Sequence, residues 1–206
     1  MQKVDFYFDF LSPYSYFAWL SHKSIDAEFV YRPVAMGSLF AHFEMKGPGE
    51  ILPKRIYMLK SCFKYAAKNN IKFIPPKSHP FNPLYALRLA TNAISDSQEK
   101  IIDILFKAAW ANGSDLSDLD LLRELLDSNG FNGEQLLDKT FEKEIKLEVK
   151  NNLKLAKQAM IFGVPSFQTN DEIFWGNDSL SSLKDFINGD EVKWDTELFK
   201  SRLGLH

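Results

Sequence analysis

Residues 4–15 have the sequence VDFYFDFLSPYS. From Val4 to Phe10, apolar residues alternate with polar or amphipathic ones, and this period of two predicts a strand. Ser12 is a favourable N-cap, and Pro13 suits the first helical turn because its missing N–H would have no partner there. The stretch therefore predicts a strand that runs directly into a helix whose N-terminus carries Ser12.

After this first strand and helix, we predict a second strand over 28–34 and then only helices as far as residue 162. These helices lie over 51–69, 82–94 and 97–111, from a cap at Ser117 to near Gly130, and, as one long helix or two in series, over 133–162. Strands over 164–169 and 172–175 and a last helix over 180–187 follow. The order β-α-β, helices, β-β-α predicts an α/β protein with a thioredoxin-like fold and a large all-helical insertion domain. We place the discontinuous core at residues 1–36 and 160–206, and the insertion at 37–159.

Composition limits the classes of function. The 206-residue chain has a net charge of −2 and no long run of one sign, which argues against a nucleic-acid-binding surface. No run of 18 apolar residues and no leader-like start are present, so we expect no membrane span. The one cysteine, Cys62, cannot form an internal disulfide, and we read it as an inert core thiol. A cytoplasmic location fits these features.

The segment Ser12-Pro13-Tyr14-Ser15 carries the first chemical signal. A thioredoxin-type oxidoreductase has Cys-Pro-x-Cys at this junction, where the helix N-terminus stabilises a thiolate. Two serines cannot exchange disulfides, but a hydroxyl can donate a hydrogen bond to a sulfur anion that a ligand brings. Glutathione is the simplest such ligand. The alternative, that Ser-Pro is only a helix cap, stays open.

Two further segments support a ligand site. Val164-Pro165 stands where a thioredoxin core keeps a cis-proline, and the backbone of Val164 would pair there with an extended ligand. The alternative is a trans proline on an edge strand. Asn177-Asp178 lies at a predicted helix N-terminus and suits the charged γ-glutamyl end of glutathione; the alternative is a plain N-cap. His22, His42 and His79 lack metal-ligand spacing, so no metal is expected.

The chain resembles a known family through co-linear blocks: residues 4–16, Arg32-Pro33-Val34, Pro53-Lys54-Arg55, Pro80-Phe81-Asn82-Pro83-Leu84, residues 162–167, and Phe174-Trp175-Gly176-Asn177-Asp178. These blocks are similar to those of bacterial 2-hydroxychromene-2-carboxylate isomerases, which belong with the kappa-class glutathione transferases. The resemblance covers residues 3 to about 188. Two positions depart from it, because Lys46 stands near an expected asparagine and Ser179 replaces an arginine.

The resemblance implies a homodimer that binds glutathione as its cofactor. The implied glutathione site consists of Ser12, Pro13, Tyr14, Lys46, Val164, Pro165, Asn177 and Asp178. Ser12 would be the catalytic residue, facing the glutathione sulfur. In this interpretation the thiolate adds reversibly to 2-hydroxychromene-2-carboxylate or a related unsaturated aromatic keto acid, as in aromatic catabolism. Lys46, Lys54 and Arg55 are the candidate cations for the substrate carboxylate.

Three functions remain open at this stage. The first is the glutathione-dependent isomerase. The second is a kappa-like glutathione transferase or peroxidase that uses the same thiolate on another electrophile. The third is a non-catalytic glutathione-binding or chaperone-like protein. A protein disulfide oxidoreductase is disfavoured because neither Ser12 nor Ser15 can form a disulfide.

Overall fold

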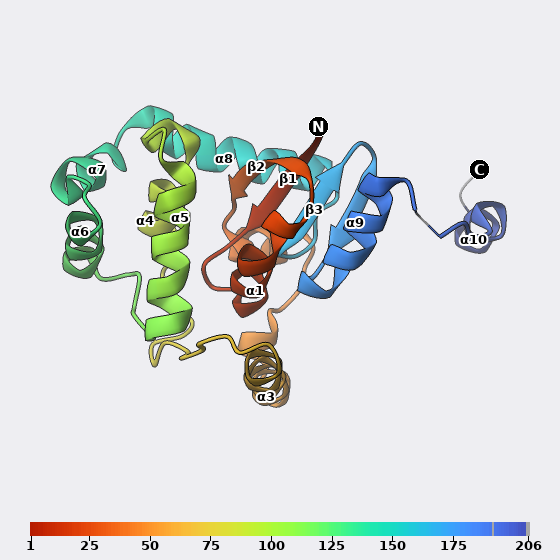
Figure 1. The fold of residues 1–206 in the computed structure, drawn as a ribbon, viewed down its shortest axis with the longest axis horizontal. Helices are drawn as coiled ribbons and strands as arrows, with labels where there is room; N and C mark the ends of the chain where they lie inside the picture. Colours follow the sequence, from red (N-terminus) through yellow and green to blue (C-terminus); the bar gives the residue numbers. More distant parts are fainter. Residues whose placement is uncertain (191, 205–206) are drawn as a thin grey trace.

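The computed structural model describes residues 1–190 and 192–204. Its centre is a four-stranded sheet with the order β2-β1-β3-β4 (Figure 1). The strands are β1 (Gln2–Phe8), β2 (Ala27–Pro33), β3 (Ser166–Thr169) and β4 (Glu172–Trp175). β1 is parallel to β2, whereas β3 is antiparallel to both β1 and β4. The two ends of the chain thus share one sheet, which confirms the predicted fold class.

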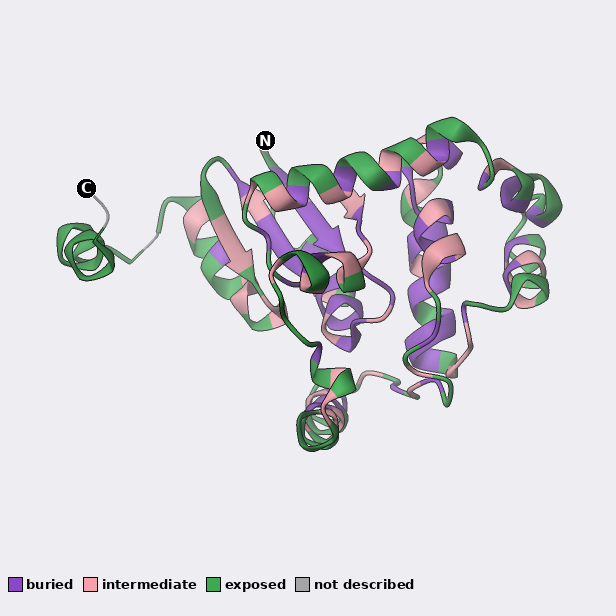
Figure 2. Cartoon of the chain, turned by 180° about the vertical axis from the view of Figure 1, so that it is seen from behind, coloured by how far each residue is buried: buried purple, intermediate pink, exposed green. Residues whose placement is uncertain are grey.

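Helices cover both faces of the sheet. α1 (Pro13–Ser21) and α9 (Leu180–Asn188) lie in front of it in Figure 1. α2 (Met36–His42) and α8 (Lys143–Gln158) lie on the opposite side, which faces the viewer in Figure 2. The central strands β1 and β3 are therefore largely buried and mostly purple in Figure 2, whereas the edge strands β2 and β4 are mostly half-buried or exposed.

The period of two in β1 sends its side chains to these two layers. Phe6 and Phe8 are fully buried in the cluster that contains Trp19 of α1, with the two phenylalanine rings 5.6 Å apart. Tyr7 points the other way and joins a second cluster with Val34 and Leu39. Burying several aromatic side chains at once provides a large part of the hydrophobic stabilisation of such a core.

The remaining helices and turns are η1 (His22–Ser24), η2 (Pro48–Glu50), α3 (Leu52–Lys68), α4 (Leu84–Leu89), η3 (Asn92–Ile94), α5 (Gln98–Phe106), η4 (Lys107–Ala111), α6 (Leu119–Ser128), α7 (Gly133–Lys139), η5 (Asn177–Ser179) and α10 (Thr196–Leu203). α5 continues into η4 as a π-helical turn. Trp110 of this turn is fully buried and donates from Nε1 to the Phe10 carbonyl oxygen at 2.9 Å. The insertion is thereby fixed to the end of β1, beside the start of α1.

The stretch 133–162, predicted as one long helix or two in series, forms two helices, α7 and α8. The predicted cap Ser117 is wrong, because the N-cap of α6 is Asp118, whose carboxylate accepts from the backbone N–H groups of Asp120 and Leu121. Ser117 instead bonds to Asp115. Serine and aspartate are both good N-caps, so the sequence alone could not show which of the two adjacent residues caps α6.

The division of the chain at residue 160 stays a prediction. α8, which that division assigns to the insertion, packs on β2: Asn152 accepts from Arg32 at 3.5 Å and donates to the Pro33 carbonyl oxygen at 3.4 Å. Positions 191, 205 and 206 of the predicted core segment lie outside the described residues. Within the described part of the chain, no helix is both long enough and apolar enough to cross a membrane.

Candidate functional site

Ser12 forms the N-terminal cap of α1. Its backbone is extended (φ −95°, ψ 113°), its side chain is 4% exposed, and Oγ accepts from the backbone N–H of Ser15 at 3.2 Å. Pro13 is the first helical residue, as the sequence predicts. The first turn of the helix, with the positive end of the helix dipole, therefore begins at the Ser12 hydroxyl.

The second motif lies directly against this cap. The Val164–Pro165 peptide bond is cis, and the Ser12 hydroxyl donates to the Val164 carbonyl oxygen at 3.2 Å. Within the described part of the chain, the Val164 N–H has no hydrogen-bond partner. Two segments 152 residues apart in the sequence thus meet at one point, where a backbone donor is left for an extended ligand.

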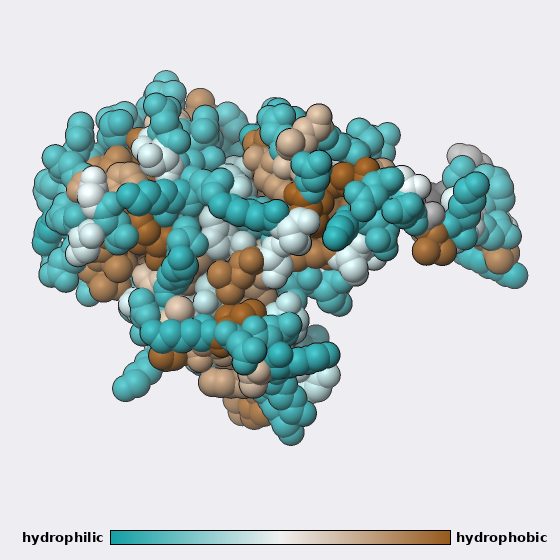
Figure 3. All heavy atoms as spheres, in the orientation of Figure 1, coloured by the Kyte–Doolittle hydropathy of each residue, from teal (hydrophilic) through white to brown (hydrophobic). Residues whose placement is uncertain are grey.

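A cavity of about 630 Å³ opens beside this point. Its lining is almost entirely apolar. The lining includes Leu11, Ser12, Phe162, Val164 and Trp175 together with Met36, Phe40, Met45, Met58 and His79. In the space-filling view, hydrophilic atoms cover most of the surface, and hydrophobic atoms show in several places, among them where α3 meets the body that contains the sheet (Figure 3). The cavity volume lies within the range usual for small-molecule sites.

A more polar cleft of about 450 Å³ lies on the other side of the same point. It is lined by Tyr14, Ser61, Tyr65, Val164, Pro165, Trp175, Gly176, Asn177 and Asp178. Tyr14, Val164 and Trp175 line both hollows. A ligand that fills the cleft can therefore reach past Val164 into the apolar cavity at the N-terminus of α1.

Asn177 and Asp178 do not cap α9. The N-cap of that helix is Ser179, which makes no side-chain capping bond, and a short 3₁₀ turn, η5, intervenes. Neither Asn177 nor Asp178 uses its side chain in a hydrogen bond with the described residues. Gly176 before them has φ +95°, and a β-carbon there would collide with the Asp178 carboxylate. The turn thus presents an amide and a carboxylate to the cleft.

The half-buried Tyr14, which lines both hollows, interacts with the buried Cys62. Burial raises the pKa of the Cys62 thiol to about 12, while the hydrogen bond that the Tyr14 hydroxyl donates acts in the opposite direction. Burial also raises the pKa of Tyr14 to about 12, with a further increase from Cys62. Both groups stay protonated at neutral pH, so Cys62 has the low reactivity expected of an inert thiol.

The candidate cations are spread around the apolar cavity, and none of them lines it. Lys46 is exposed and belongs to neither lining. Lys54 lines a shallow hollow of about 400 Å³ shared with Tyr14. Arg55 is half-buried and donates to the His79 carbonyl oxygen at 2.8 Å. Of the three, Arg55 is engaged by His79, whereas Lys46 and Lys54 make no hydrogen bond with the described residues.

Asp9 contributes to the site in a way that sequence reasoning missed. It is fully buried, and its carboxylate accepts from the backbone N–H groups of Leu11 at 3.0 Å and Met36 at 2.8 Å. Its own carbonyl oxygen accepts from the Ser12 N–H at 3.1 Å. Burial raises the pKa of this carboxyl to about 6, although the backbone hydrogen bonds lower it. Asp9 thus connects two walls of the cavity and the cap of α1.

Sequence reasoning also missed His79 and the aromatic rim. His79 was considered only as a metal ligand, yet it lines the cavity. Phe162 and Trp175 pack with ring centroids 4.9 Å apart, and a β-carbon at Gly163 would lie 2.8 Å from the indole nitrogen of Trp175. The glycine in Phe162-Gly163-Val164 was the available signal, because a glycine before a proline-containing turn often permits a close approach.

Ser15 does not make the local bond expected of a helical serine. Its side chain is fully buried and its Oγ atom has no hydrogen-bond partner among the described residues. Burying an unpaired hydroxyl costs about 1–3 kcal/mol. We therefore expect Ser15→Ala to leave the free energy of unfolding unchanged or to raise it by about 1 kcal/mol, as measured by urea unfolding. A clear loss of stability would mean that the hydroxyl has a partner.

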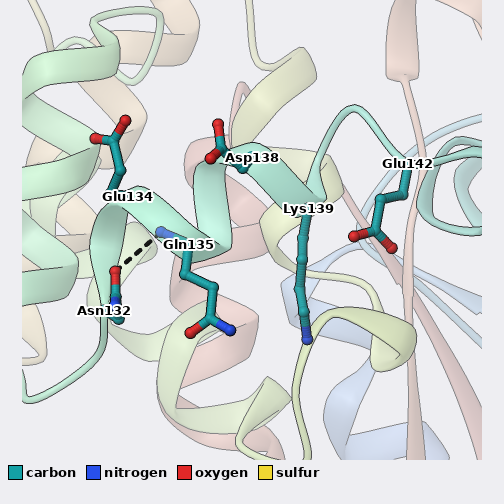
Figure 4. A pocket seen from close by; sticks show the side chains of 6 residues that line it. All are labelled: Asn132, Glu134, Gln135, Asp138, Lys139 and Glu142. Carbon is teal, nitrogen blue, oxygen red and sulfur yellow. Dashed lines mark hydrogen bonds between the residues drawn. The ribbon is translucent and has the colours of Figure 1, made fainter.

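A hollow of about 460 Å³ on α7 has no comparable chemistry. Its side chains spread apart rather than converge: Glu134 and Asp138 point away from Gln135 and Lys139 (Figure 4). Asn132 is occupied as the cap of α7, where it accepts from the Gln135 N–H at 2.9 Å. Across the described residues, no group of three or more His, Cys, Asp and Glu side chains is placed to hold a metal ion.

Comparison with protein families assigns the fold. A family model described as the DSBA-like thioredoxin domain matches residues 3–188. The chain belongs to this family. The site of this chain differs from a disulfide-exchange centre, because Ser12 and Ser15 occupy the positions where that chemistry needs cysteines.

Individual relatives confirm the resemblance seen in the sequence blocks. The chain is 27% identical to 2-hydroxychromene-2-carboxylate isomerase of Sphingobium xenophagum over 190 residues, which cover 89% of this chain and 97% of that protein. It is 26% identical to glutathione S-transferase kappa 1 of Caenorhabditis elegans over 208 residues, with 91% of each chain covered. A solved structure of a 2-hydroxychromene-2-carboxylate isomerase superposes with a TM-score of 0.81 at 21% identity over 99% of both chains.

Proposed function

We propose that the protein is a glutathione-dependent isomerase that acts on 2-hydroxychromene-2-carboxylate or a related unsaturated aromatic keto acid. The observation that carries the proposal is that a polar cleft and an apolar cavity share Val164, whose carbonyl oxygen accepts from the Ser12 hydroxyl. Relatives with isomerase and transferase names, at 26–27% identity, support the same class of enzyme.

The residues present fit glutathione. The tripeptide needs a partner for its extended backbone, partners for its charged γ-glutamyl end, and an environment that favours a thiolate. Val164, with its free N–H, supplies the first. Asn177 and Asp178 supply the second from the floor of the cleft. Ser12 and the N-terminus of α1 supply the third. Lys46 stays outside both linings, so its predicted contact is not part of this proposal.

Bound glutathione would supply a nucleophilic thiol that adds to an electron-poor carbon and leaves again once the adjacent bond has rotated. The chain's own part is to bind, orient and stabilise charge. The Ser12 hydroxyl donates to Val164 in this structure, and it would turn from that carbonyl oxygen to the sulfur. The α1 dipole adds a favourable field, and the apolar walls exclude water.

Glutathione binding tests the proposal directly. Isothermal titration of the purified protein with glutathione is expected to show saturable binding, accompanied by thiolate absorbance near neutral pH. Incubation with a chromene carboxylate should then yield the rearranged acid while the glutathione concentration stays constant. A protein that ignores the tripeptide would overturn the proposal.

One observation favours a second candidate, a kappa-like glutathione transferase or peroxidase. The apolar cavity has no lysine or arginine in its lining, so a neutral aromatic electrophile fits it without a carboxylate partner. Consumption of glutathione in step with product would identify this activity. A non-catalytic glutathione-binding protein would bind the tripeptide and show neither reaction.

We also propose a cytoplasmic location and a homodimer. The location rests on the fact that the one cysteine is buried and makes no disulfide, which suits a reducing compartment. The homodimer rests on the family resemblance, and light scattering of the purified protein tests it.

A further inference from the structure

His79 is held firmly at the edge of the apolar cavity. Its Nε2 atom lies 3.0 Å from the carbonyl oxygen of Leu11, the residue before Ser12. Arg55 holds the His79 backbone carbonyl oxygen at 2.8 Å, and the imidazole packs on the Trp110 ring with centroids 5.4 Å apart. Contacts to α3, η4 and the segment before α1 therefore fix the ring beside the cap that carries Ser12.

These contacts also decide which nitrogen of His79 is basic. A carbonyl oxygen only accepts, so the bond to Leu11 requires the proton on Nε2, and the neutral ring keeps its lone pair on Nδ1. Nδ1 has no hydrogen-bond partner among the described residues, and it is not among their buried unpaired atoms. The neighbouring ring carbon Cε1 would lie 3.6 Å from a β-carbon on Gly49, which also lines the cavity.

The other titratable groups near the His79 ring are hydrogen-bonded, protonated or positively charged. Glu50 of η2 accepts from the Gly47 N–H at 2.7 Å, and Tyr14 of α1 is kept protonated by burial. Asp9 is bonded to two backbone N–H groups, and Arg55 of α3 carries a permanent positive charge. Burial lowers the pKa of His79, the hydrogen bond to Leu11 raises it by less, and the charge of Arg55 lowers it further, so the ring is neutral at neutral pH.

We propose that His79 Nδ1 accepts the thiol proton of glutathione when the tripeptide binds, and returns it at the end of the reaction. The inference rests on the proposed function. The S–H bond breaks, an N–H bond forms at Nδ1, and the electron pair stays on sulfur. The reverse transfer restores the thiol, so no proton or electron is lost. The imidazolium and the thiolate then stabilise each other as an ion pair, as in other thiol sites with a neighbouring histidine.

Proton release on glutathione binding tests the inference. Titration calorimetry at pH 7 in buffers of different ionisation enthalpy counts the protons released per tripeptide, and thiolate absorbance counts the sulfur anions formed. In the wild-type protein the thiolate count should exceed the proton count, because the proton moves to His79. In His79→Gln the two counts should become equal, and turnover should fall roughly a hundredfold, the scale for losing a general base.

The choice of variants separates catalysis from positioning. In His79→Gln the side-chain amide nitrogen can reach the position of Nε2 and keep the bond to Leu11, whereas His79→Ala loses both functions. If His79 only positions Leu11, the glutamine variant will behave like the wild type and the inference is overturned. It is also overturned if the wild-type protein releases one proton per thiolate. S-methylglutathione, which has no thiol proton, should give equal proton counts in both proteins.

Failure of the proposed function would look different. In that case the wild-type protein would bind neither glutathione nor S-methylglutathione in the same titration. Tight binding together with equal thiolate and proton counts would overturn only the role of His79.

Discussion

Replacing Ser12 with alanine is expected to lower turnover by roughly ten- to a thousandfold, the scale for removing one donor that stabilises developing charge. The hydroxyl is buried at the start of α1 and can turn from the Val164 carbonyl oxygen toward a bound sulfur. Steady-state rates with glutathione and a chromene carboxylate measure the effect. Thiolate absorbance of the bound tripeptide at neutral pH should fall with the rate.

Ser15→Ala is the matched control for this result. It makes the same chemical change in the same helical turn, but its hydroxyl lines neither hollow and bonds to no described residue. Ser12→Ala also removes a helix cap, which costs about 1 kcal/mol, so rates should be compared well below the unfolding temperature of both variants. An unchanged rate in Ser12→Ala would remove this residue from the mechanism.

Asp9 should make the stability of the protein depend on pH between about 4 and 6. Burial raises the pKa of its carboxyl from 3.8 to about 6 in the folded protein. The folded state therefore binds the proton more tightly than the unfolded state. Its contribution to the free energy of unfolding is fully present below about pH 4 and is lost as the pH rises through about 6. With about 1.4 kcal/mol per pKa unit, the change is on the order of 3 kcal/mol.

Urea unfolding of the wild type and of Asp9→Asn at several pH values isolates this contribution. The difference between the two free energies of unfolding should fall by that amount from pH 4 to pH 7, because asparagine does not titrate. Asp26→Asn, which makes the same chemical change at an exposed position, is the matched control. A constant difference for Asp9→Asn would contradict the prediction.

The sequence predicted those parts of the molecule that local chemistry decides. The alternation in β1, the cap at Ser12 and the proline at the first turn of α1 each depend on neighbours a few residues away. The contact of Ser12 with Val164 was also within reach, because the thioredoxin-like order of elements places those two segments side by side. Asn177 and Asp178 line the cleft by the same topology.

Asp9 and His79 were beyond this kind of reasoning. Asp9 was read as a polar residue of an alternating strand, and its burial depends on the N–H of Met36, which lies 27 residues away. His79 depends on the path of a proline-rich loop that brings it to Leu11, 68 residues away. In both cases the contact joins two irregular loops that are far apart in the sequence. Hydrophobic periodicity predicts helices and strands, but it does not predict contacts between loops.

The apolar cavity is lined by three separate stretches of the chain. Residues 11–14 and 162–175 include groups proposed to hold glutathione, whereas residues 36–80 supply the rest of the lining. Residues 36–80 contact the region around the α1 cap through Met36, Cys62 and His79. Their apolar side chains Phe40, Met45 and Met58 line the cavity. The range of accepted molecules can therefore diverge by substitution in one loop-and-helix segment while the underlying reaction is inherited unchanged.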